Sequence, residues 1–457
     1  MVALATPTGV GAIAVIRLSG KNAITIANKS CSKDLLSAKS HTIHLGKILD
    51  EENLAIDEVL FSIFIAPKSY TRENVVEVSC HGSSYIIQQL LALYIRQGAR
   101  LAQAGEFTQR AFLNGQLDLS QAEAVADLIA SKSRQAHAIA MQQMRGGFSD
   151  DIKQLRQQLI DFASLIELEL DFSEEDVEFA DRTALKALVI KIQQVIEQLI
   201  HSFQLGNAIK HGVSTVLAGR PNAGKSTLLN ALLNEDRAIV SDIAGTTRDT
   251  IEEVLNIKGL EFRLIDTAGI RDASDQIEAI GVEKTLEKIA QSAILLYIFD
   301  VIETPPKAVA EDLKKLTTPE SKVLLIGNKM DLNPYTEYKH YADALSAVDI
   351  PLLAEHFIPL SAIHQMNIEH LKEQLYKTVV EEELTNSTIV SNSRHVEALH
   401  GAYESLDKAL ENMETGISSD FVAMDIRQAL YYLGSITGEV STDDLLSNIF
   451  SNFCIGK

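Results

Sequence analysis

Residues 219–226 have the sequence Gly-Arg-Pro-Asn-Ala-Gly-Lys-Ser, which matches the spacing GxxxxGK[ST] between a predicted strand and a predicted helix. In such a loop the glycines allow backbone N–H groups to surround phosphate oxygens at a helix N-terminus. We expect Lys225 to contact the β- and γ-phosphates of a nucleotide and the Ser226 hydroxyl to ligate Mg²⁺. Because the pattern also arises by chance, it predicts a bound nucleotide and no more.

A second motif that can sense phosphate is Asp266-Thr267-Ala268-Gly269, which closes a later predicted strand. The Asp266 carboxylate can reach Mg²⁺ through water, and the Gly269 N–H can sense a γ-phosphate. Both groups would change their contacts when a nucleoside triphosphate is hydrolysed.

Two further motifs predict the base. Residues 328–331 (Asn-Lys-Met-Asp) follow a strand, and the Asp331 carboxylate can accept hydrogen bonds from guanine N1–H and the exocyclic amine. Adenine does not present these two donors together. Ser361-Ala362 can supply a backbone N–H to guanine O6. Each motif alone could be an ordinary loop, but four in this order at the carboxyl ends of predicted strands predict a GTPase domain.

The water-activating group is not the usual one. Ile270 follows the second motif, at the position where Ras-type enzymes place a glutamine that orients the attacking water. Since isoleucine cannot do this, the group must come from elsewhere, and residues 271–278 offer carboxylates. Residues 245–249 (Gly-Thr-Thr-Arg-Asp) are typical of a switch loop, in which Thr247 can complete the Mg²⁺ shell.

The elements that position these loops alternate between strands and helices, which predicts a doubly wound, mainly parallel sheet. The predicted strands are residues 213–219, 250–259, 260–269, 293–300, 322–331 and 356–362. Amphipathic helices lie on both sides of this segment in the sequence. The simplest prediction is a helical bundle with a P-loop domain inserted into it.

Apolar residues three and four positions apart predict the bundle helices at residues 152–166, 185–199 and 396–413. Ser120 followed three residues later by Glu123 matches a capping box, so we expect a long helix from there to Gly146-Gly147.

The N-terminal part has a mixed α/β pattern. β-Branched runs at residues 11–20, 58–67 and 74–82 predict strands, and residues 83–98 predict a helix that ends at a glycine.

Composition and charge limit the classes of protein to which the chain can belong. The 457 residues include 62 acidic and 41 basic side chains, a net charge of −21, so any nucleic-acid contact needs a local basic patch. The carboxylate-rich residues 161–180 fit a solvated helix face and its end better than a metal site. No apolar run is long enough to span a membrane, and the first residues lack the features of a signal or transit peptide. Three scattered cysteines (Cys31, Cys80 and Cys454) favour a reducing compartment, and we predict a cytoplasmic protein.

The sequence resembles a known family, the tRNA modification GTPases called MnmE or TrmE. The resemblance rests on RPNAGKS, SDIAGTTRD, DTAGIRDASDQIEAIGVE and, above all, the terminal FCIGK at residues 453–457. It extends over the whole chain, including GEFTQRAFLNGQLDLSQAEAVADLI in the first part.

The resemblance implies GTP hydrolysis that uses potassium in place of an arginine finger. The implied potassium positions are Asn222, Ser241, Ile243 and Thr246, and Glu278 matches the water-activating glutamate. The predicted GTP-binding residues are Asn222, Ala223, Gly224, Lys225, Ser226, Thr227, Ser241, Asp242, Ile243, Ala244, Gly245, Thr246, Thr247, Asp266, Thr267, Ala268, Gly269, Asn328, Lys329, Met330, Asp331, Ser361 and Ala362.

The resemblance also implies an N-terminal domain that is similar to tetrahydrofolate-binding domains and forms a homodimer. Arg17, Glu77 and Lys457 fall on folate-site positions, whereas Gln116 stands where the family pattern has a lysine. A carboxylate pairs with pterin donors, and cations suit the folate carboxylates. Without the resemblance, Arg17 and Glu77 could be a plain ion pair, and Cys454 is more often a buried small side chain than a nucleophile.

The implied reaction transfers a one-carbon unit from 5-formyl- or 5,10-methylene-tetrahydrofolate to C5 of the wobble uridine (position 34) in certain tRNAs. The product carries a carboxymethylaminomethyl group, and the implied partner is the FAD-dependent MnmG (GidA), in a heterotetramer. Two other readings are a ribosome-assembly GTPase, for which we find no GxxG RNA-binding loop, and a membrane-remodelling GTPase, which the acidic charge disfavours.

We therefore predict four segments: residues 1–116 for folate binding and dimerisation, 117–210 as the first half of the helical domain, 211–380 as a Ras-like G domain, and 381–457 as the second half.

Overall fold

A computed structural model describes residues 1–171, 182–233, 252–266, 293–317, 321–350, 352–380, 388–415, 418–451 and 453–456. The chain divides into two compact units. One unit contains residues 1–130, 139–197 and 394–457, and the other contains residues 131–138 and 198–393. The four predicted segment boundaries stay predictions.

The N-terminal sheet has five strands in the order β1-β2-β5-β4-β3, and its hydrogen-bonded neighbours are antiparallel. Its strands are β1 (Val2–Leu4), β2 (Gly11–Ser19), β3 (Thr42–Leu49), β4 (Ala55–Phe64) and β5 (Val75–Gly82). Two helices, α1 (Ala23–Lys29) and α2 (Ser84–Arg96), contact this sheet. Every second side chain of β2 (Ala14, Ile16 and Leu18) is buried in their shared core, as a strand with one covered face requires.

The opposite face of this sheet presents apolar side chains to solvent. In the strand register, Val15 of β2 lies beside Ser79, which lies beside Leu60, which lies beside Leu45. The next row joins Arg17, Glu77, Ser62 and Ile43. The large apolar side chains exposed on this face are Ile13, Ile43, Leu45 and Leu60.

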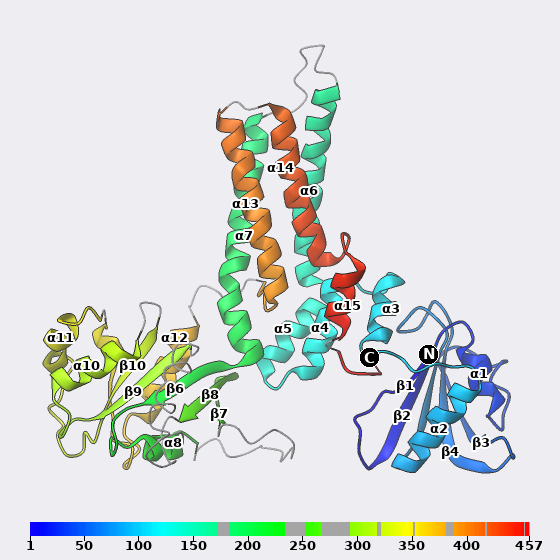
Figure 1. The fold of residues 1–457 in the computed structure, drawn as a ribbon, viewed down its shortest axis with the longest axis horizontal. Helices are drawn as coiled ribbons and strands as arrows, with labels where there is room; N and C mark the ends of the chain where they lie inside the picture. The colour runs from blue at the N-terminus through cyan, green and yellow to red at the C-terminus, as the bar shows by residue number, and fades with distance from the viewer. Residues whose placement is uncertain are drawn as a thin grey trace, which may run out of the picture. The chain divides into compact units, whose positions relative to one another are not determined.

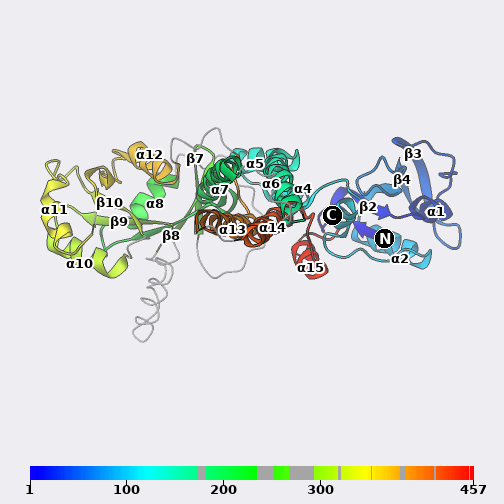
Figure 2. The same ribbon diagram turned by 90° about the horizontal axis from the view of Figure 1, so that it is seen from above.

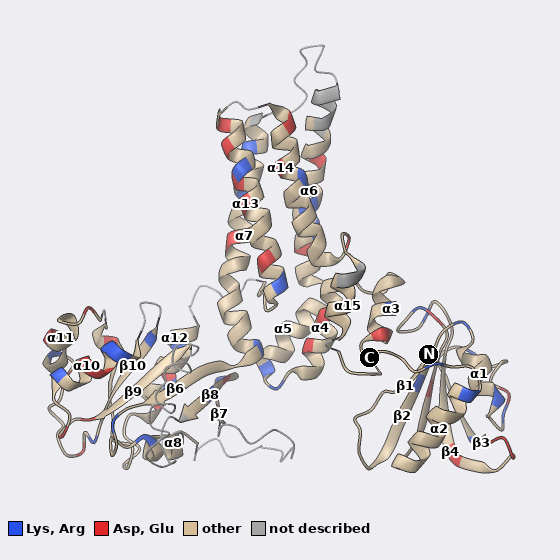
Figure 3. Ribbon diagram, viewed as in Figure 1, with Lys and Arg blue, Asp and Glu red and all other residues tan. Residues whose placement is uncertain are grey.

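The helical region contains α3 (Glu106–Leu113), α4 (Leu119–Ala130), α5 (Arg134–Met144), α6 (Gly147–Asp171), α7 (Arg182–His211), α13 (Ser393–Thr415), α14 (Ser419–Thr437) and α15 (Asp443–Ser451). The long helices α6, α7, α13 and α14 lie side by side (Figure 1, Figure 2). Their buried apolar residues recur at helical spacing, as Ile152, Leu155 and Leu159 do in α6. Both basic and acidic residues are distributed along these helices (Figure 3).

The expected single helix from Ser120 to residue 146 is wrong in two respects. The segment forms two helices, α4 and α5, with residues 131–133 between them. The cap of α4 lies two residues earlier than expected, because Asp118 Oδ1 accepts from the Gln121 N–H (3.0 Å) and Gln121 Oε1 accepts from the Asp118 N–H (2.9 Å). This exchange satisfies two backbone donors at the helix start. Ser120 itself is buried, and its hydroxyl bonds to Asp118 and Ser149.

The inserted domain is a six-stranded sheet in the order β11-β10-β9-β6-β8-β7, parallel except for β7. Its strands are β6 (Val213–Ala218), β7 (Glu252–Ile257), β8 (Leu260–Asp266), β9 (Ile294–Asp300), β10 (Lys322–Asn328) and β11 (Phe357–Pro359). Its helices are α8 (Lys225–Leu233), α10 (Pro306–Leu316), α11 (Lys339–Ser346), the short 3₁₀ helix η3 (Ala354–His356) and α12 (Ile368–Val379). All seven residues of β9 are buried, as expected of a central strand with both faces covered.

The predicted fold class is therefore confirmed: an N-terminal α/β region, a helical region and an inserted doubly wound sheet. Within the described ranges, no helix combines the length and the apolar character needed to cross a membrane.

Candidate functional site: a guanine nucleotide pocket

The P-loop connects the end of β6 to the first residue of α8, and two glycines set its path. Gly219 has φ +155°, and a Cβ there would lie 2.1 Å from the Ile298 carbonyl oxygen. Gly224 has φ +98°, and its Cβ would lie 2.2 Å from Asn328 Nδ2. A side chain at either position would meet these atoms, so the loop backbone packs directly on β9 and on the last residue of β10.

The lysine of this loop is held by the loop itself. Lys225 Nζ donates to the carbonyl oxygens of Gly219 (2.8 Å) and Arg220 (2.9 Å). These two carbonyls place the ammonium group in the P-loop, where a P-loop lysine meets phosphate oxygens. Asn222 adopts φ +63°, a left-handed conformation that asparagine tolerates better than most residues.

Asn328 joins three of the predicted motifs. Its Nδ2 donates to the Ala223 carbonyl (2.8 Å), and its Oδ1 accepts from the Ala362 N–H (3.0 Å). Asn328 is buried, so each polar atom of its amide needs a partner. The Asn328 side chain therefore connects the P-loop to the two loops that are predicted to read guanine.

The carboxylate that is predicted to read the base is oriented by a neighbour. Asp331 Oδ1 accepts from the Ser361 hydroxyl (2.6 Å), and this hydrogen bond lowers the pKa of Asp331 below its ordinary value. The carboxyl group is therefore ionised at neutral pH, as two guanine donors require.

Lys329 and Met330, which precede Asp331, are also held by hydrogen bonds. Lys329 Nζ donates to Asp300 Oδ2 (2.5 Å) at the end of β9. Burial raises the pKa of Asp300, but the hydrogen bond and charge of Lys329 together with the backbone N–H groups of Ile302 and Glu303 outweigh it and leave that pKa lowered. Met330 is buried, and its backbone N–H donates to the Leu360 carbonyl (3.2 Å).

These loops line one pocket of about 680 Å³. Its lining includes the predicted residues Asn222, Gly224, Lys225, Ser226, Thr227, Asn328, Lys329, Asp331 and Ser361. It also includes Pro221, Leu332 and Ile363, which sequence reasoning missed as site residues although Leu332 and Ile363 directly follow two of the motifs. The volume lies within the range of small-molecule sites.

Several predicted residues cannot be placed. Glu278, Thr267, Ala268, Gly269 and the switch segment at residues 241–247 lie outside the described residues. The backbone of Asp266 ends β8, where it lies beside Leu217 of β6 in the parallel register. The motif after β8 therefore starts at the same sheet edge as the P-loop.

Of the folate candidates, Arg17 and Glu77 are brought together. Arg17 Nε donates to Glu77 Oε1 (2.8 Å), which agrees with their adjacent positions in β2 and β5. The guanidinium carbon lies 5.8 Å from the ring centroid of Tyr70 and 5.5 Å from that of Phe107. Sequence reasoning did not find these two rings, because neither is close to Arg17 in the chain.

The C-terminal tail reaches this ion pair. Arg17 Nη1 donates to the Gly456 carbonyl (3.3 Å), and Ile455 forms a β-bridge with Ala104. Gly456 has φ +95°, and a Cβ there would lie 2.1 Å from the Leu4 carbonyl oxygen. The tail can therefore adopt this path only with glycine at this position.

Three further predictions for the folate site and the tail concern Gln116, Lys457 and Cys454. Gln116 is exposed, and its Oε1 accepts from Arg72 Nε (3.0 Å). Lys457 lies outside the described residues. The expectation that Cys454 is buried is wrong: its side chain is exposed, because the main chain carries the contact there through the Cys454 carbonyl, which accepts from the Gly105 N–H (3.3 Å).

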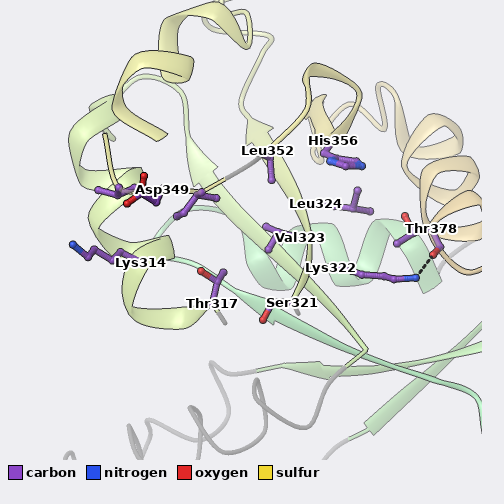
Figure 4. A pocket seen from close by; sticks show the side chains of 12 residues that line it. Lys314, Thr317, Ser321, Lys322, Val323, Leu324, Asp349, Leu352, His356 and Thr378 are labelled. Atoms are coloured by element: carbon purple, nitrogen blue, oxygen red, sulfur yellow. Dashed lines mark hydrogen bonds between the residues drawn. The ribbon is translucent and has the colours of Figure 1, made fainter. Parts of the chain in front are cut away.

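A second cavity of about 620 Å³ lies elsewhere in the inserted domain (Figure 4). It borders the first residues of β10 and includes Lys322, whose Nζ donates to the Thr378 carbonyl (3.0 Å). None of the predicted nucleotide residues lines it. It lies at the amino end of β10, whereas nucleotides bind at the carboxyl ends of parallel strands.

Comparisons with known proteins show the family to which the chain belongs. The family descriptions "GTP-binding protein TrmE N-terminus" and "MnmE helical domain" match residues 1–116 and 119–454. The chain is 53% identical to the tRNA modification GTPase MnmE of Cytophaga hutchinsonii over 100% of this chain and 97% of that one. It is 53% identical to the protein of the same name from Flavobacterium psychrophilum, over 100% and 99%. A solved structure of Era from Aquifex aeolicus is 25% identical over 42% of this chain and 66% of that one, with a TM-score of 0.29, too low to support an inference. The chain therefore belongs to the MnmE family of tRNA modification GTPases.

Proposed function

We propose that this GTP hydrolase depends on potassium and acts in the cytoplasm with the FAD-dependent MnmG. Together they would install a carboxymethylaminomethyl group at C5 of the wobble uridine in certain tRNAs, with a one-carbon unit from 5-formyl- or 5,10-methylene-tetrahydrofolate. The observation that carries this proposal is the pair of separate sites: a guanine nucleotide pocket in one unit and the Arg17–Glu77 pair in the other.

The residues of the nucleotide pocket fit two cations. Ser226 lines the pocket as the second residue of α8, where a hydroxyl oxygen suits Mg²⁺, and Thr247 would complete the Mg²⁺ shell. Asn222 lines the same pocket and offers a neutral amide oxygen, which suits a large, weakly hydrated ion. Bound there, K⁺ would offset the charge that develops between the β- and γ-phosphates. Ser241, Ile243 and Thr246 would supply the remaining oxygens, and Glu278 would take a proton from the attacking water.

The residues around Arg17 fit a reduced folate. The carboxylate of Glu77 can accept hydrogen bonds from pterin N–H groups, and both Arg17 and Glu77 are partly exposed, so a ligand can reach them. Tyr70, which is partly exposed, offers aromatic surface close to the guanidinium, and the buried Phe107 lies behind it. Lys457 directly follows Gly456, which contacts Arg17, so its charge would lie near the folate carboxylates. Gln116 would add a neutral contact at most.

The exposed sheet face supports a homodimer. Ile13, Ile43, Leu45 and Leu60 leave apolar surface in water on the same face as Arg17 and Glu77. A second copy of this face would cover it, since a self-complementary patch is the usual basis of a two-fold dimer. The folate site would then lie next to the dimer interface.

Reconstitution tests the whole proposal. The purified chain is mixed with MnmG, tRNA, GTP, Mg²⁺, KCl, 5,10-methylene-tetrahydrofolate and glycine, which supplies the nitrogen and the carboxymethyl carbons that the one-carbon unit lacks, and the nucleosides are analysed by mass spectrometry. We expect the modified wobble uridine only when the chain, MnmG and folate are all present. Modification without folate would contradict the one-carbon source, and GTP hydrolysis without modification under all conditions would limit the function to the GTPase reaction.

A further inference from the structure

Arg220, the arginine of the P-loop, pairs with a carboxylate on a helix outside the loop. Arg220 Nε donates to Asp312 Oδ2 (2.7 Å), and Arg220 Nη2 donates to Asp312 Oδ1 (3.1 Å). Two parallel hydrogen bonds between a guanidinium and a carboxylate fix both planes, which a single contact does not. Asp312 lies in α10, which follows β9 and is far from the P-loop in the sequence.

A buried tyrosine holds the same carboxylate in place. The Tyr297 hydroxyl donates to Asp312 Oδ2 (2.6 Å), and Tyr297 is 1% exposed. In the parallel register Tyr297 lies beside Ala218, the last residue of β6 before the P-loop. Burial raises the pKa of Asp312, but the hydrogen bonds from Arg220 and Tyr297 together with the charges of Arg220 and Lys315 outweigh it, so the carboxylate is charged at neutral pH.

Arg220 also contributes one of the two carbonyls that hold the P-loop lysine. Lys225 Nζ donates to the carbonyls of Gly219 and Arg220, so the orientation of these two peptide units sets where the ammonium group lies. Gly219 packs against Ile298 of β9, which fixes the first of them. The side chain of Arg220 anchors the second, and Asp312 is its partner.

We propose that Asp312, supported by Tyr297, is a positioning residue for nucleotide binding: it anchors Arg220 to α10 and thereby keeps the start of the P-loop in the conformation that receives phosphates. The arrangement has a second consequence. The guanidinium of Arg220 gives two of its N–H groups to Asp312, so a carboxylate already offsets its charge in this conformation. The proposal concerns GTP binding itself and holds whether or not the folate or potassium chemistry is correct.

A double-mutant cycle tests this role. Full-length wild type, Arg220→Ala, Asp312→Ala and the double variant are compared for the Kd of a fluorescent GDP analogue. We expect each single variant to bind GDP about tenfold more weakly, the usual size of a lost charge-assisted pair. If Asp312 acts through Arg220, the double variant loses no more than either single variant. The KM for GTP should rise in parallel while kcat at saturating GTP stays within about twofold of wild type.

Two further variants separate positioning from folding. Tyr297→Phe keeps the ring in the core and removes only the hydroxyl donor, so we expect a two- to threefold loss of GDP affinity with the fold intact. Glu311→Ala removes an exposed carboxylate from the same helix and should leave the Kd unchanged. Unchanged GDP affinity in Asp312→Ala overturns the proposal. So does a double variant whose loss equals the product of the two single losses. If Asp312→Ala does not fold, unchanged GDP affinity in both Tyr297→Phe and Arg220→Ala overturns it.

Discussion

Glu123 of α4 and His395 of α13 are 272 positions apart in the sequence, and His395 Nε2 lies 2.7 Å from Glu123 Oε2. Arg394 completes the cluster, because its Nε and Nη2 donate to the two oxygens of the same carboxylate (2.9 and 2.7 Å). Arg394 Nη1 also donates to the Ser435 carbonyl (2.7 Å) near the end of α14. Glu123 and Arg394 together therefore join three helices.

Glu123→Gln should destabilise the unit that contains α4. Burial raises the pKa of Glu123, but the charges and hydrogen bonds of His395 and Arg394 outweigh it and lower that pKa to about 2. Breaking a buried ion pair from one side costs roughly 3–5 kcal/mol, and glutamine keeps some hydrogen bonds, so we expect a loss of about 3 kcal/mol in the free energy of unfolding. Urea denaturation followed by circular dichroism measures it.

The same carboxylate predicts the pH dependence of stability. Its pKa is lowered in the folded state, so its contribution is complete above the ordinary value of 4.5 and is lost as pH falls from 4.5 towards about 2. The difference in stability between wild type and Glu123→Gln should shrink in this window. Glu414→Gln, which removes an exposed partner of Lys186, is the matched control and should show a much smaller effect. An equal loss in both variants would contradict a special role for the buried cluster.

Asp331→Asn should change the base specificity of the nucleotide pocket. The substitution replaces an acceptor by a donor, so a guanine donor would face another donor while xanthine would find a partner. We expect GTP affinity to fall by about 10²-fold and xanthosine triphosphate to bind better than GTP. Fluorescent nucleotide titration measures both. Ser361→Ala, which removes only the orienting hydroxyl 2.6 Å from Asp331, should weaken GTP binding less and keep guanine specificity. If Asp331→Asn keeps its GTP affinity, the base-reading assignment is wrong.

Glu278→Ala should lower GTP turnover by about 10²–10⁴-fold while GTP affinity stays nearly intact, the usual range for loss of a general base. The reason is the apolar Ile270 at the position that otherwise orients water. Single-turnover hydrolysis with matched binding data checks this. Normal hydrolysis in the variant would move the role to Asp272 or Asp275.

Hydrolysis should be faster in KCl than in NaCl at matched ionic strength, by about tenfold or more, a small part of the roughly 10³–10⁵ that an arginine finger supplies. Asn222→Gly should remove most of this advantage while Mg²⁺-dependent GTP binding survives. Glycine is a better replacement than alanine because Asn222 has φ +63°, where alanine adds about 1 kcal/mol of backbone strain. Equal rates in the two salts would refute the potassium mechanism and direct attention to Arg248 or Arg271.

Removal of residues 453–457 should weaken binding of a reduced folate by about tenfold or more and leave basal GTP hydrolysis unchanged. The deletion removes Gly456, whose carbonyl accepts from Arg17, together with the charge of Lys457. Calorimetry with 5-formyl-tetrahydrofolate measures the loss. Lys457→Ala separates the charge from the main-chain contact, and Gln116→Lys should tighten binding if position 116 faces the ligand. Equal folate affinity in the full-length and truncated chains would exclude the tail from the site.

The loops that line the pocket of the inserted domain could be predicted from the sequence, because each motif is a short loop that follows a strand. Gly219 and Gly224 are needed for the backbone path itself, and parallel strands bring their carboxyl ends to one edge of the sheet. The order of the motifs therefore determines which loops meet. The Arg17–Glu77 pair could also be anticipated from the sequence, since both residues lie in segments whose pattern predicts strands. Leu332 and Ile363 were missed because an apolar side chain beside a motif carries no signal of its own.

Contacts between side chains that are distant in the sequence were decided only by the tertiary structure. Glu123 has the spacing of a capping residue after Ser120, yet Asp118 and Gln121 cap α4, and Glu123 pairs with Arg394 and His395. Arg220 could have faced the phosphates, and Asp312 of α10 holds it instead. Helix and strand patterns follow from local backbone geometry, which nearby residues set. Which charge meets which depends on how whole elements pack, and that packing leaves no periodic trace around any one of these residues.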